Sequence, residues 1–365
     1  MTHERQDNPY FELMPIEARH SLLLDRVIAG TRNTLGAFGV GATILTGMAT
    51  IIGEGDLDAG YRTGMIVLSD SINSCDDLPA DALQTARNQL DEGRTRPKSN
   101  EYSAYDSDDK ERARADRFNV RITYDAAQEA EARINKADTD EAVVAAANEY
   151  TLSQFGFKTF VEDVSSDPKS RNTTLADDAR DMVSILYKLP QELVQKVAQG
   201  ALKEVELNAD VADENEFGLR VGHYRSGSQT IRVAIGHVNK VFTHEFGHAA
   251  AVKESLMHCF LPTVKPQAAF TASNPPGLEY TGDGLKAGRN AISTYAGTGE
   301  DEDYAENVFN MATPESLCPL NGSSPVKEKM AVTVATLNDI APHSGSFLAD
   351  RMADRQAYYG DICSR

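Results

Sequence analysis

The 365-residue sequence predicts an α+β fold, in which a mostly α-helical N-terminal domain, residues 1–175, precedes a mixed domain, residues 176–365. Two observations lead to this class. A chain of this length accommodates two domains, and a polar segment near residue 170 offers a boundary. Helical spacing of apolar residues dominates before that boundary, whereas a β-branched segment, residues 230–236, lies among helical segments after it.

The first segment of interest, residues 34–53, carries no charge. Its length is enough to cross a bilayer, and its glycines offer small faces of the kind that pack closely in membranes. Glycine also lowers the hydrophobicity, and the segment is followed by the acidic Glu54 and Asp56 rather than by basic residues. We therefore favour a buried glycine-rich helical hairpin over contact with a membrane.

Two polar segments and a helix follow. Residues 91–117 are polar and dense in charge, which predicts a loop or linker. Residues 126–150 are rich in Ala and Glu and predict a helix. Its modest apolar stripe consists of Ala127, Ala130, Ile134, Ala137 and Val144. A second polar loop, residues 165–174, precedes a helix that starts near Leu175.

The C-terminal domain is predicted to contain a helix and a strand before its most informative segment. Residues 189–197 place apolar side chains at helical spacing. Residues 230–236 alternate β-branched and other residues, which predicts a strand. This strand ends shortly before residues 243–250, with the sequence THEFGHAA.

That run contains the pattern H-E-x-x-H, which is typical of zinc peptidases. On a helix, His244 and His248 share a face about one turn apart, so both imidazoles can reach one metal ion. Glu245 lies one step round, where its carboxylate can take a proton from a metal-bound water. Only Gly247 mildly disfavours a helix here. Chance would supply the pattern in roughly one such chain in a hundred, so a third ligand is needed to support it.

The third ligand is expected downstream. One known pattern requires a glycine and then a histidine six residues after the second histidine, but Ala251 and Glu254 stand at those places. His258 lies ten residues past the second histidine, too far along one helix to reach the same metal. A second helix offers Glu302 and Glu306, which share a face. One of these carboxylates can bind the metal while the other orients a ligand histidine.

The segment 293–306, STYAGTGEDEDYAE, resembles the second active-site block of the anthrax lethal factor family. In that family an H-E-F-G-H-A helix is followed, some tens of residues later, by S-x-Y, a short turn and E-x-x-A-E. A tyrosine seven residues before the ligand glutamate faces the zinc, and Tyr295 stands seven residues before Glu302 here. The related Pro-Pro endopeptidases share the plan. The resemblance spans roughly the last half of the chain.

The resemblance implies a zincin-type metallopeptidase domain that binds Zn²⁺. The roles it implies are zinc ligation by His244, His248 and Glu302, general-base catalysis by Glu245, transition-state stabilisation or proton donation by Tyr295, and orientation of a ligand histidine by Glu306. Because the aminopeptidase pattern G-x-M-E-N is absent, we expect a zinc-dependent endopeptidase that hydrolyses peptide bonds of protein substrates.

The same resemblance suggests a secreted bacterial effector or toxin that acts on a host protein. The first residues, MTHERQD, are charged and no apolar core follows closely, so no Sec signal peptide is predicted. We therefore expect either a cytoplasmic protein or export by a non-Sec route, with delivery into a host cell. The alternative is a non-catalytic effector that binds a membrane or partner and retains a zincin-like site. The intact Glu245 and Tyr295 speak against it.

Three segments near the motifs bear on the substrate. The strand at residues 230–236 is either an edge strand that pairs with an extended peptide or an ordinary core strand, and the two readings weigh equally. Residues 300–303 are all acidic and predict a preference for basic peptides. The loop at residues 262–288 joins the two motif helices and is expected to shape specificity.

Charge and cysteine content narrow the partners. A net charge of −19 argues against binding to nucleic acid, whose phosphates would be repelled, and leaves a protein or peptide as the expected partner. The four cysteines, Cys75, Cys259, Cys318 and Cys363, are far apart and form no C-x-x-C motif. The sequence therefore shows no structural-zinc or redox motif, and the even number of cysteines permits two disulfides without requiring them.

Overall fold

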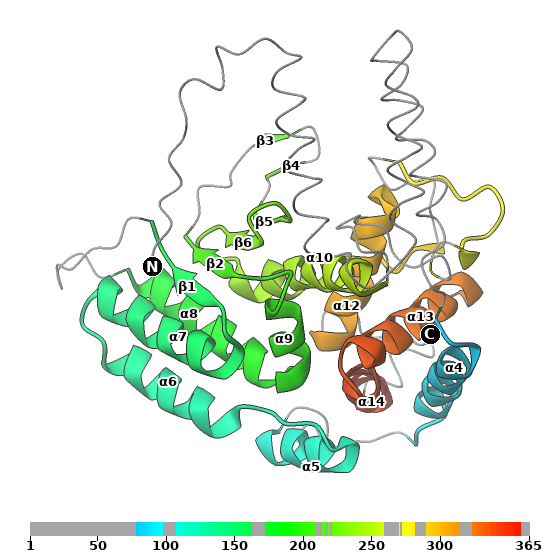
Figure 1. Ribbon diagram of the computed structural model, residues 1–365, viewed down its shortest axis with the longest axis horizontal. Coiled ribbons are helices and arrows are strands. Elements are labelled where there is room, and N and C mark those ends of the chain that lie inside the picture. The colour runs from blue at the N-terminus through cyan, green and yellow to red at the C-terminus, as the bar shows by residue number, and fades with distance from the viewer. Residues whose placement is uncertain are drawn as a thin grey trace, which may run out of the picture. The chain divides into compact units, whose positions relative to one another are not determined.

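The computed structural model describes residues 78–97, 107–162, 172–208, 214–215, 218–219, 221–258, 270, 272–281, 290–313 and 323–358 (Figure 1). They belong to one compact unit, Ser74–Arg365. The predicted hairpin at residues 34–53 and all four cysteines lie outside the described residues. Among the helices that are described, none has the length and apolar character needed to cross a membrane.

The described part is mixed and mostly helical, with one small sheet. Its α-helices are α4 (Ala80–Arg94), α5 (Asp108–Phe118), α6 (Tyr124–Lys136), α7 (Asp140–Phe155), α8 (Thr173–Tyr187), α9 (Gln191–Ala198), α10 (Val238–His258), α12 (Glu300–Ala312), α13 (Ser324–Ile340) and α14 (Ser344–Tyr358), and η5 (Ala296–Thr298) is a 3₁₀ turn. The strands are β1 (Lys158–Phe160), β2 (Glu204–Leu207), β5 (Gly222–Arg225) and β6 (Thr230–Val233), with a separate short pair, β3 (Glu214–Asn215) and β4 (Gly218–Leu219). This content agrees with the predicted α+β class.

The helix predicted at residues 126–150 is two helices, α6 and α7. The Thr139 side chain accepts a hydrogen bond from the Ala142 backbone N–H at 3.1 Å, which caps a new helix three residues after α6 ends. Gly156, with a φ of 88°, ends α7 in the left-handed conformation that glycine adopts without strain. The predicted apolar stripe faces the core: four of its residues are buried and Ala137 is partly buried.

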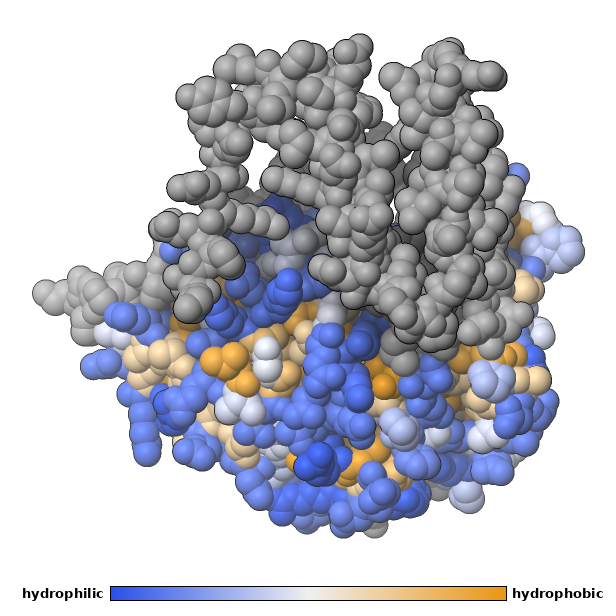
Figure 2. Space-filling view, viewed as in Figure 1, coloured by the Kyte–Doolittle hydropathy of each residue, from blue (hydrophilic) through white to orange (hydrophobic). Residues whose placement is uncertain are grey.

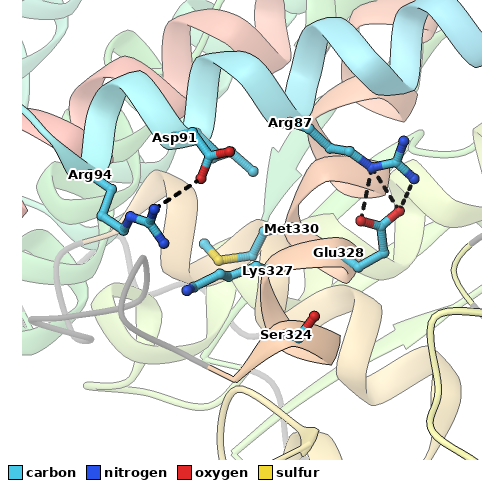
Figure 3. A pocket seen from close by; sticks show the side chains of 8 residues that line it. Arg87, Asp91, Arg94, Ser324, Lys327, Glu328 and Met330 are labelled. Carbon is cyan, nitrogen blue, oxygen red and sulfur yellow. Dashed lines mark hydrogen bonds and ion pairs between the residues drawn. The ribbon is translucent and has the colours of Figure 1, made fainter.

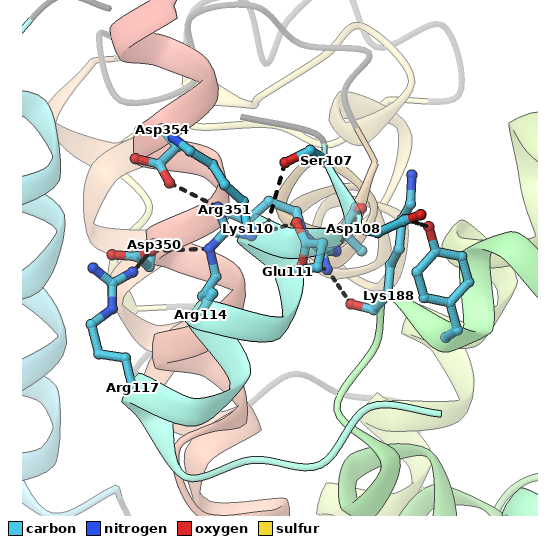
Figure 4. Close-up of polar contacts among 12 residues, drawn as sticks. Ser107, Asp108, Lys110, Glu111, Arg114, Arg117, Lys188, Asp350, Arg351 and Asp354 are labelled. Carbon is cyan, nitrogen blue, oxygen red and sulfur yellow. Dashed lines mark hydrogen bonds and ion pairs between the residues drawn. The ribbon is translucent and has the colours of Figure 1, made fainter. Parts of the chain in front are cut away.

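The prediction of a loop at residues 91–117 is wrong at both ends, because α4 continues to Arg94 and α5 begins at Asp108. Tertiary ion pairs stabilise this charged helix (Figure 4). The Arg114 guanidinium donates to Asp350 on α14 at 3.0 Å, and Glu111 accepts from Arg351 at 3.0 Å. Burial alone would raise the pKa of Glu111, but the Arg351 and Arg114 charges hold it below its usual value. Local composition cannot reveal partners that lie more than two hundred residues away.

The main sheet has the strand order β1-β2-β6-β5. β1, β2 and β6 are parallel, and β5 runs antiparallel to β6 at the edge. Val205 pairs with Ile231, and Leu207 pairs with Val233, so these fully buried side chains share one face of the sheet. α10 contacts β5 and β6 as well as α12, and therefore lies between the sheet edge and the second motif helix (Figure 1).

One hydrophobic core runs through the described residues. It includes apolar side chains of α4, α6 and α7 together with those of α8, α10, α13 and α14. α4 packs against α13 and α14, and α7 packs against α8 and β1. The described helices on both sides of residue 175 thus share a core, and the division into domains 1–175 and 176–365 stays a prediction.

Candidate metal centre

The helix that carries the H-E-x-x-H pattern starts at a capped turn after β6. Gly236 adopts a φ of 78°, and the Asp178 carboxylate on α8 accepts hydrogen bonds from the backbone N–H groups of Gly236 at 2.6 Å and Val238 at 3.4 Å. A negative charge at a helix N-terminus also interacts favourably with the helix dipole. Asp178 thereby caps the N-terminus of α10.

Gly247 allows α12 to approach α10 closely. A Cβ built at Gly247 would lie 2.8 Å from the Cα of Ala305, closer than real Cβ atoms come to other atoms, and 3.0 Å from its carbonyl oxygen, which is also tight. The glycine that disfavours a helix in the sequence is therefore required by packing between helices. This contact brings Glu302 and Glu306 over the two histidines.

His244, His248 and Glu302 converge and can hold a metal ion. The His244 Nε2 atom lies 3.2 Å from His248 Nε2 and 2.9 Å from Glu302 Oε2, and His248 Nε2 lies 3.3 Å from that same oxygen. Ligands at 2.0–2.1 Å from a tetrahedral zinc are about 3.3 Å apart, so the three atoms form a triangle of the size of one tetrahedral face. His244 is 6% and His248 9% exposed, which places the triangle in a mostly dry site.

Glu306 holds His244 from the opposite ring nitrogen. Its Oε1 atom lies 2.9 Å from His244 Nδ1, and its Oε2 atom accepts from the Ser293 hydroxyl at 2.7 Å. Burial would lower the pKa of His244, but hydrogen bonds to Glu302 and Glu306 outweigh it and raise the pKa to about 10. Burial would raise the pKa of Glu302, and the two histidines instead lower it. Carboxylates that stabilise a proton on His244 also stabilise a metal cation at the same place.

Glu245 lies between α10 and the edge strand. The backbone of Tyr224 in β5 hydrogen bonds to its carboxylate, and a Cβ on Gly222 would lie 2.9 Å from its Oε1 atom. Burial raises the pKa of Glu245, while the adjacent His248 and His244 lower it in part. A raised pKa makes the carboxylate a stronger base, which suits proton abstraction from water.

Tyr295 lies at the rim of the triangle. It immediately precedes η5, the residue is 52% exposed, and its ring centroid lies 5.4 Å from that of His244. Its side chain therefore lies beside the metal cluster while facing solvent, where a substrate can reach it.

The structure decides between the two readings of residues 230–236. β6 pairs with β2 on one side and β5 on the other, so it is a core strand, and the reading as an edge strand is wrong. The edge strand beside Glu245 is β5, which the sequence reading missed. Its four residues, GHYR, offer no apolar alternation, and only the pairing with β6 in the folded sheet identifies β5 as the edge strand.

The acidic run 300–303 is only partly available to a substrate. Asp303 is buried and paired with Lys329, and Glu302 belongs to the metal cluster. Glu300 and Asp301 are partly exposed. His258, the alternative ligand, is the last residue of the continuous helix α10, about 15 Å along the axis from His248.

Two cavities lie apart from the metal cluster. One, of about 170 Å³, lies between α4 and α13 beside the Arg87–Glu328 ion pair (Figure 3). The other, of about 470 Å³, lies between α4 and α14 and is lined in part by Gln89 and Phe118. On the face in view, hydrophilic residues surround small apolar patches across the described residues (Figure 2). Neither cavity contains a residue of the metal centre.

Comparisons with protein-family models, with curated proteins and with solved structures find no match for this chain. The chemistry of the centre therefore rests on its own geometry. That geometry brings the predicted residues together in one place: His244, Glu245, His248, Tyr295, Glu302 and Glu306.

Proposed function

We propose that this protein is a zinc-dependent endopeptidase with a zincin-type catalytic domain of the lethal factor kind. The observation that carries the proposal is the ligand triangle of His244, His248 and Glu302 with Glu245 beside it. A structural metal site has no need of an adjacent buried carboxylate that is not a ligand, whereas hydrolysis requires a base there.

Zinc fits this donor set best. Two imidazole nitrogens and one carboxylate oxygen are the ligands of one common class of catalytic zinc site, which leaves a fourth position for water or substrate. Purely oxygen ligands would instead suit magnesium or calcium, and thiolates would suit structural zinc. When bound, zinc supplies a Lewis acid that polarises the scissile carbonyl and acidifies the attacking water.

Three residues of the chain have separate roles in the proposed reaction. Glu245 accepts a proton from the attacking water at its carboxylate and later delivers it to the leaving amine nitrogen. The Tyr295 hydroxyl donates a hydrogen bond to the carbonyl oxygen as negative charge develops on it. Glu306 keeps the His244 ring oriented through Nδ1, which leaves Nε2 for the metal.

The position of β5 supports a peptide substrate. β5 pairs with β6 on one side and is the last strand of the described sheet on the other. An extended peptide can add to such an edge through backbone hydrogen bonds, which brings its carbonyl groups past Glu245. Glu300 and Asp301 are partly exposed, so their negative charges still support the predicted preference for basic residues in the substrate. Action on a host protein remains a prediction from the resemblance.

The experiment compares newly formed protein N-termini in a cell lysate treated with the wild-type protein and with the Glu245→Gln variant. We expect a set of new termini that only the wild type produces, and their flanking residues will show whether Lys or Arg is preferred. If the wild type and Glu245→Gln both contain a full complement of zinc but produce identical sets of N-termini, the protein is not an endopeptidase. Profiles without a basic preference would remove only the role of Glu300 and Asp301.

A further inference from the structure

A buried lysine outside the metal centre holds the segment that carries Tyr295. Lys329 on α13 is fully buried, and an ammonium group has three N–H donors. Each has an acceptor: Asp303 Oδ2 at 2.5 Å, the Tyr280 hydroxyl at 3.1 Å and the Asn290 carbonyl oxygen at 3.1 Å. Because a buried charge without partners is very costly, this satisfied arrangement fixes all three groups around Lys329.

The three acceptors come from different parts of the chain. Asp303 is the neighbour of the ligand Glu302 in α12, whereas Tyr280 and Asn290 belong to the connection between α10 and α12. The Tyr280 hydroxyl also donates to Asp303 Oδ2 at 2.9 Å, which closes a ring of contacts with Lys329.

The clamped segments lead directly to Tyr295. Next to Tyr280, the Thr281 N–H donates to the carbonyl oxygen of Gly297 at 3.2 Å, two residues after Tyr295. A small apolar cluster of Ala291 and Ala296, with Leu278 and Ile292 packed against it, joins the same segments. Lys329 therefore contacts the two segments next to η5, through Tyr280 and Asn290. It also contacts Asp303 in α12, which is adjacent to Glu302 in the chain.

From these contacts we infer that Lys329, with Asp303 and Tyr280, forms a positioning clamp that holds Tyr295 beside the metal centre. The inference rests on the proposed function, since Tyr295 has a transition state to stabilise only in an endopeptidase. The clamp touches neither the ligand triangle nor the edge strand. Its loss should therefore lower turnover while metal binding and substrate affinity stay near those of the wild type.

The test measures kcat, KM and zinc content of Lys329→Met, Tyr280→Phe and Tyr295→Phe, singly and with each of the first two combined with Tyr295→Phe. We expect kcat to fall about tenfold or more in Lys329→Met with KM within about twofold, because small misplacements of a catalytic group cost that much. Adding either substitution to Tyr295→Phe should lower kcat no further. Fully additive losses in the double variants would overturn the clamp.

Arg351→Met is the matched control, because it also removes a buried cation from an ion pair, on α14. It should lower stability but leave the kcat of folded protein unchanged, and a loss of kcat equal to that of Lys329→Met would contradict a specific role. If Lys329→Met does not fold, Tyr280→Phe decides, since it removes only a hydroxyl.

Hydrogen exchange separates failure of the clamp from failure of the proposed function. The N–H groups of Ala296, Gly297 and Thr298 are bonded to Ser293 Oγ and to the carbonyls of Thr294 and Tyr295. In Tyr280→Phe these amides and that of Thr281 should exchange faster, while those of α10 should not. If these amides exchange faster in Tyr280→Phe but the wild type cleaves no protein, the clamp is supported and the peptidase function is rejected. Unchanged exchange together with additive kinetics would reject the clamp alone.

Discussion

Gly247 and Ala305 touch through their backbones, and a Cβ on Gly247 would stand 2.8 Å from the Ala305 Cα. The contact sets the separation of α10 and α12, and with it the distance from the two histidines to Glu302. Gly→Ala within a helix ordinarily stabilises a protein by roughly 0.5–1 kcal/mol. Here the sign should reverse, because the added methyl group meets backbone atoms that cannot move aside.

We therefore expect Gly247→Ala to weaken zinc binding by about tenfold or more, as displacement of the groups that support metal ligands commonly does. Competition with a chelator of known affinity measures the change. Gly227→Ala is the control, because a Cβ at Gly227 meets no atom within 4 Å. Equal zinc affinity in Gly247→Ala and the wild type would mean that the helix contact does not set the site.

Glu306→Gln tests the support of His244. The neutral amide cannot match the charge-assisted hydrogen bond to Nδ1, so zinc affinity should fall by roughly 10- to 100-fold. The same chelator competition applies. Ser293→Ala, which removes only the hydroxyl that donates to Glu306, should give a smaller loss in the same direction. A larger loss of zinc affinity in Ser293→Ala than in Glu306→Gln would contradict the conclusion that Glu306 supports His244 directly and Ser293 acts through Glu306.

Tyr295→Phe tests the oxyanion donor. Loss of one such donor should lower kcat by roughly 100-fold with little change in KM, because the interaction forms only in the transition state. Zinc content, measured by elemental analysis, should stay that of the wild type. Unchanged turnover would remove Tyr295 from the catalytic group.

Glu111→Gln tests the buried ion pairs between α5 and α14 through the pH dependence of stability. The folded-state pKa of Glu111 lies below its ordinary value of 4.5, so the carboxylate stabilises the fold above pH 4.5. That contribution is lost as the pH falls through the folded-state pKa. At pH 7 the variant should lose about 3 kcal/mol of unfolding free energy, and the difference from the wild type should shrink in acid.

Urea unfolding across the pH range measures this difference. Glu149→Gln is the control, because Glu149 pairs with Arg133 at an exposed position and should change stability little at any pH. A Glu111→Gln deficit that persists unchanged well below pH 4 would mean that packing, rather than charge, holds α5 in place.

The convergence of His244, His248 and Glu302 agrees with the sequence prediction, although the choice of Glu302 over Glu306 as third ligand rested on the family resemblance. Residues i and i+4 share a face of a helix. The sequence therefore indicates that the two histidines lie on one face of their helix and that the two glutamates lie on one face of theirs. The role of Gly247 was not predictable, because its reason lies in a backbone contact with α12. The edge strand β5 was not predicted for a related reason. Its four residues show no alternation of apolar and polar side chains, and its position at the edge depends on its pairing with β6 in the folded sheet.

Helices held by distant partners were also hidden. α5 has a charged sequence typical of a loop, and it is stabilised by Asp350 and Arg351 from the far end of the chain. Lys329 belongs to the same class, since a lysine in an apolar helix predicts nothing until Asp303 and Tyr280 meet it. Sequence patterns reveal periodicity within an element, whereas burial of charge is decided between elements.

The most direct test of the central claim is the zinc content and peptide turnover of Glu245→Gln, measured beside the wild type on a substrate taken from the lysate experiment. Glu245 is not a ligand of the triangle, so we expect the variant to bind zinc as the wild type does and to lose nearly all turnover. Wild-type turnover in Glu245→Gln would contradict the assigned base. Absence of zinc from both proteins after equilibration with the metal would contradict the centre itself.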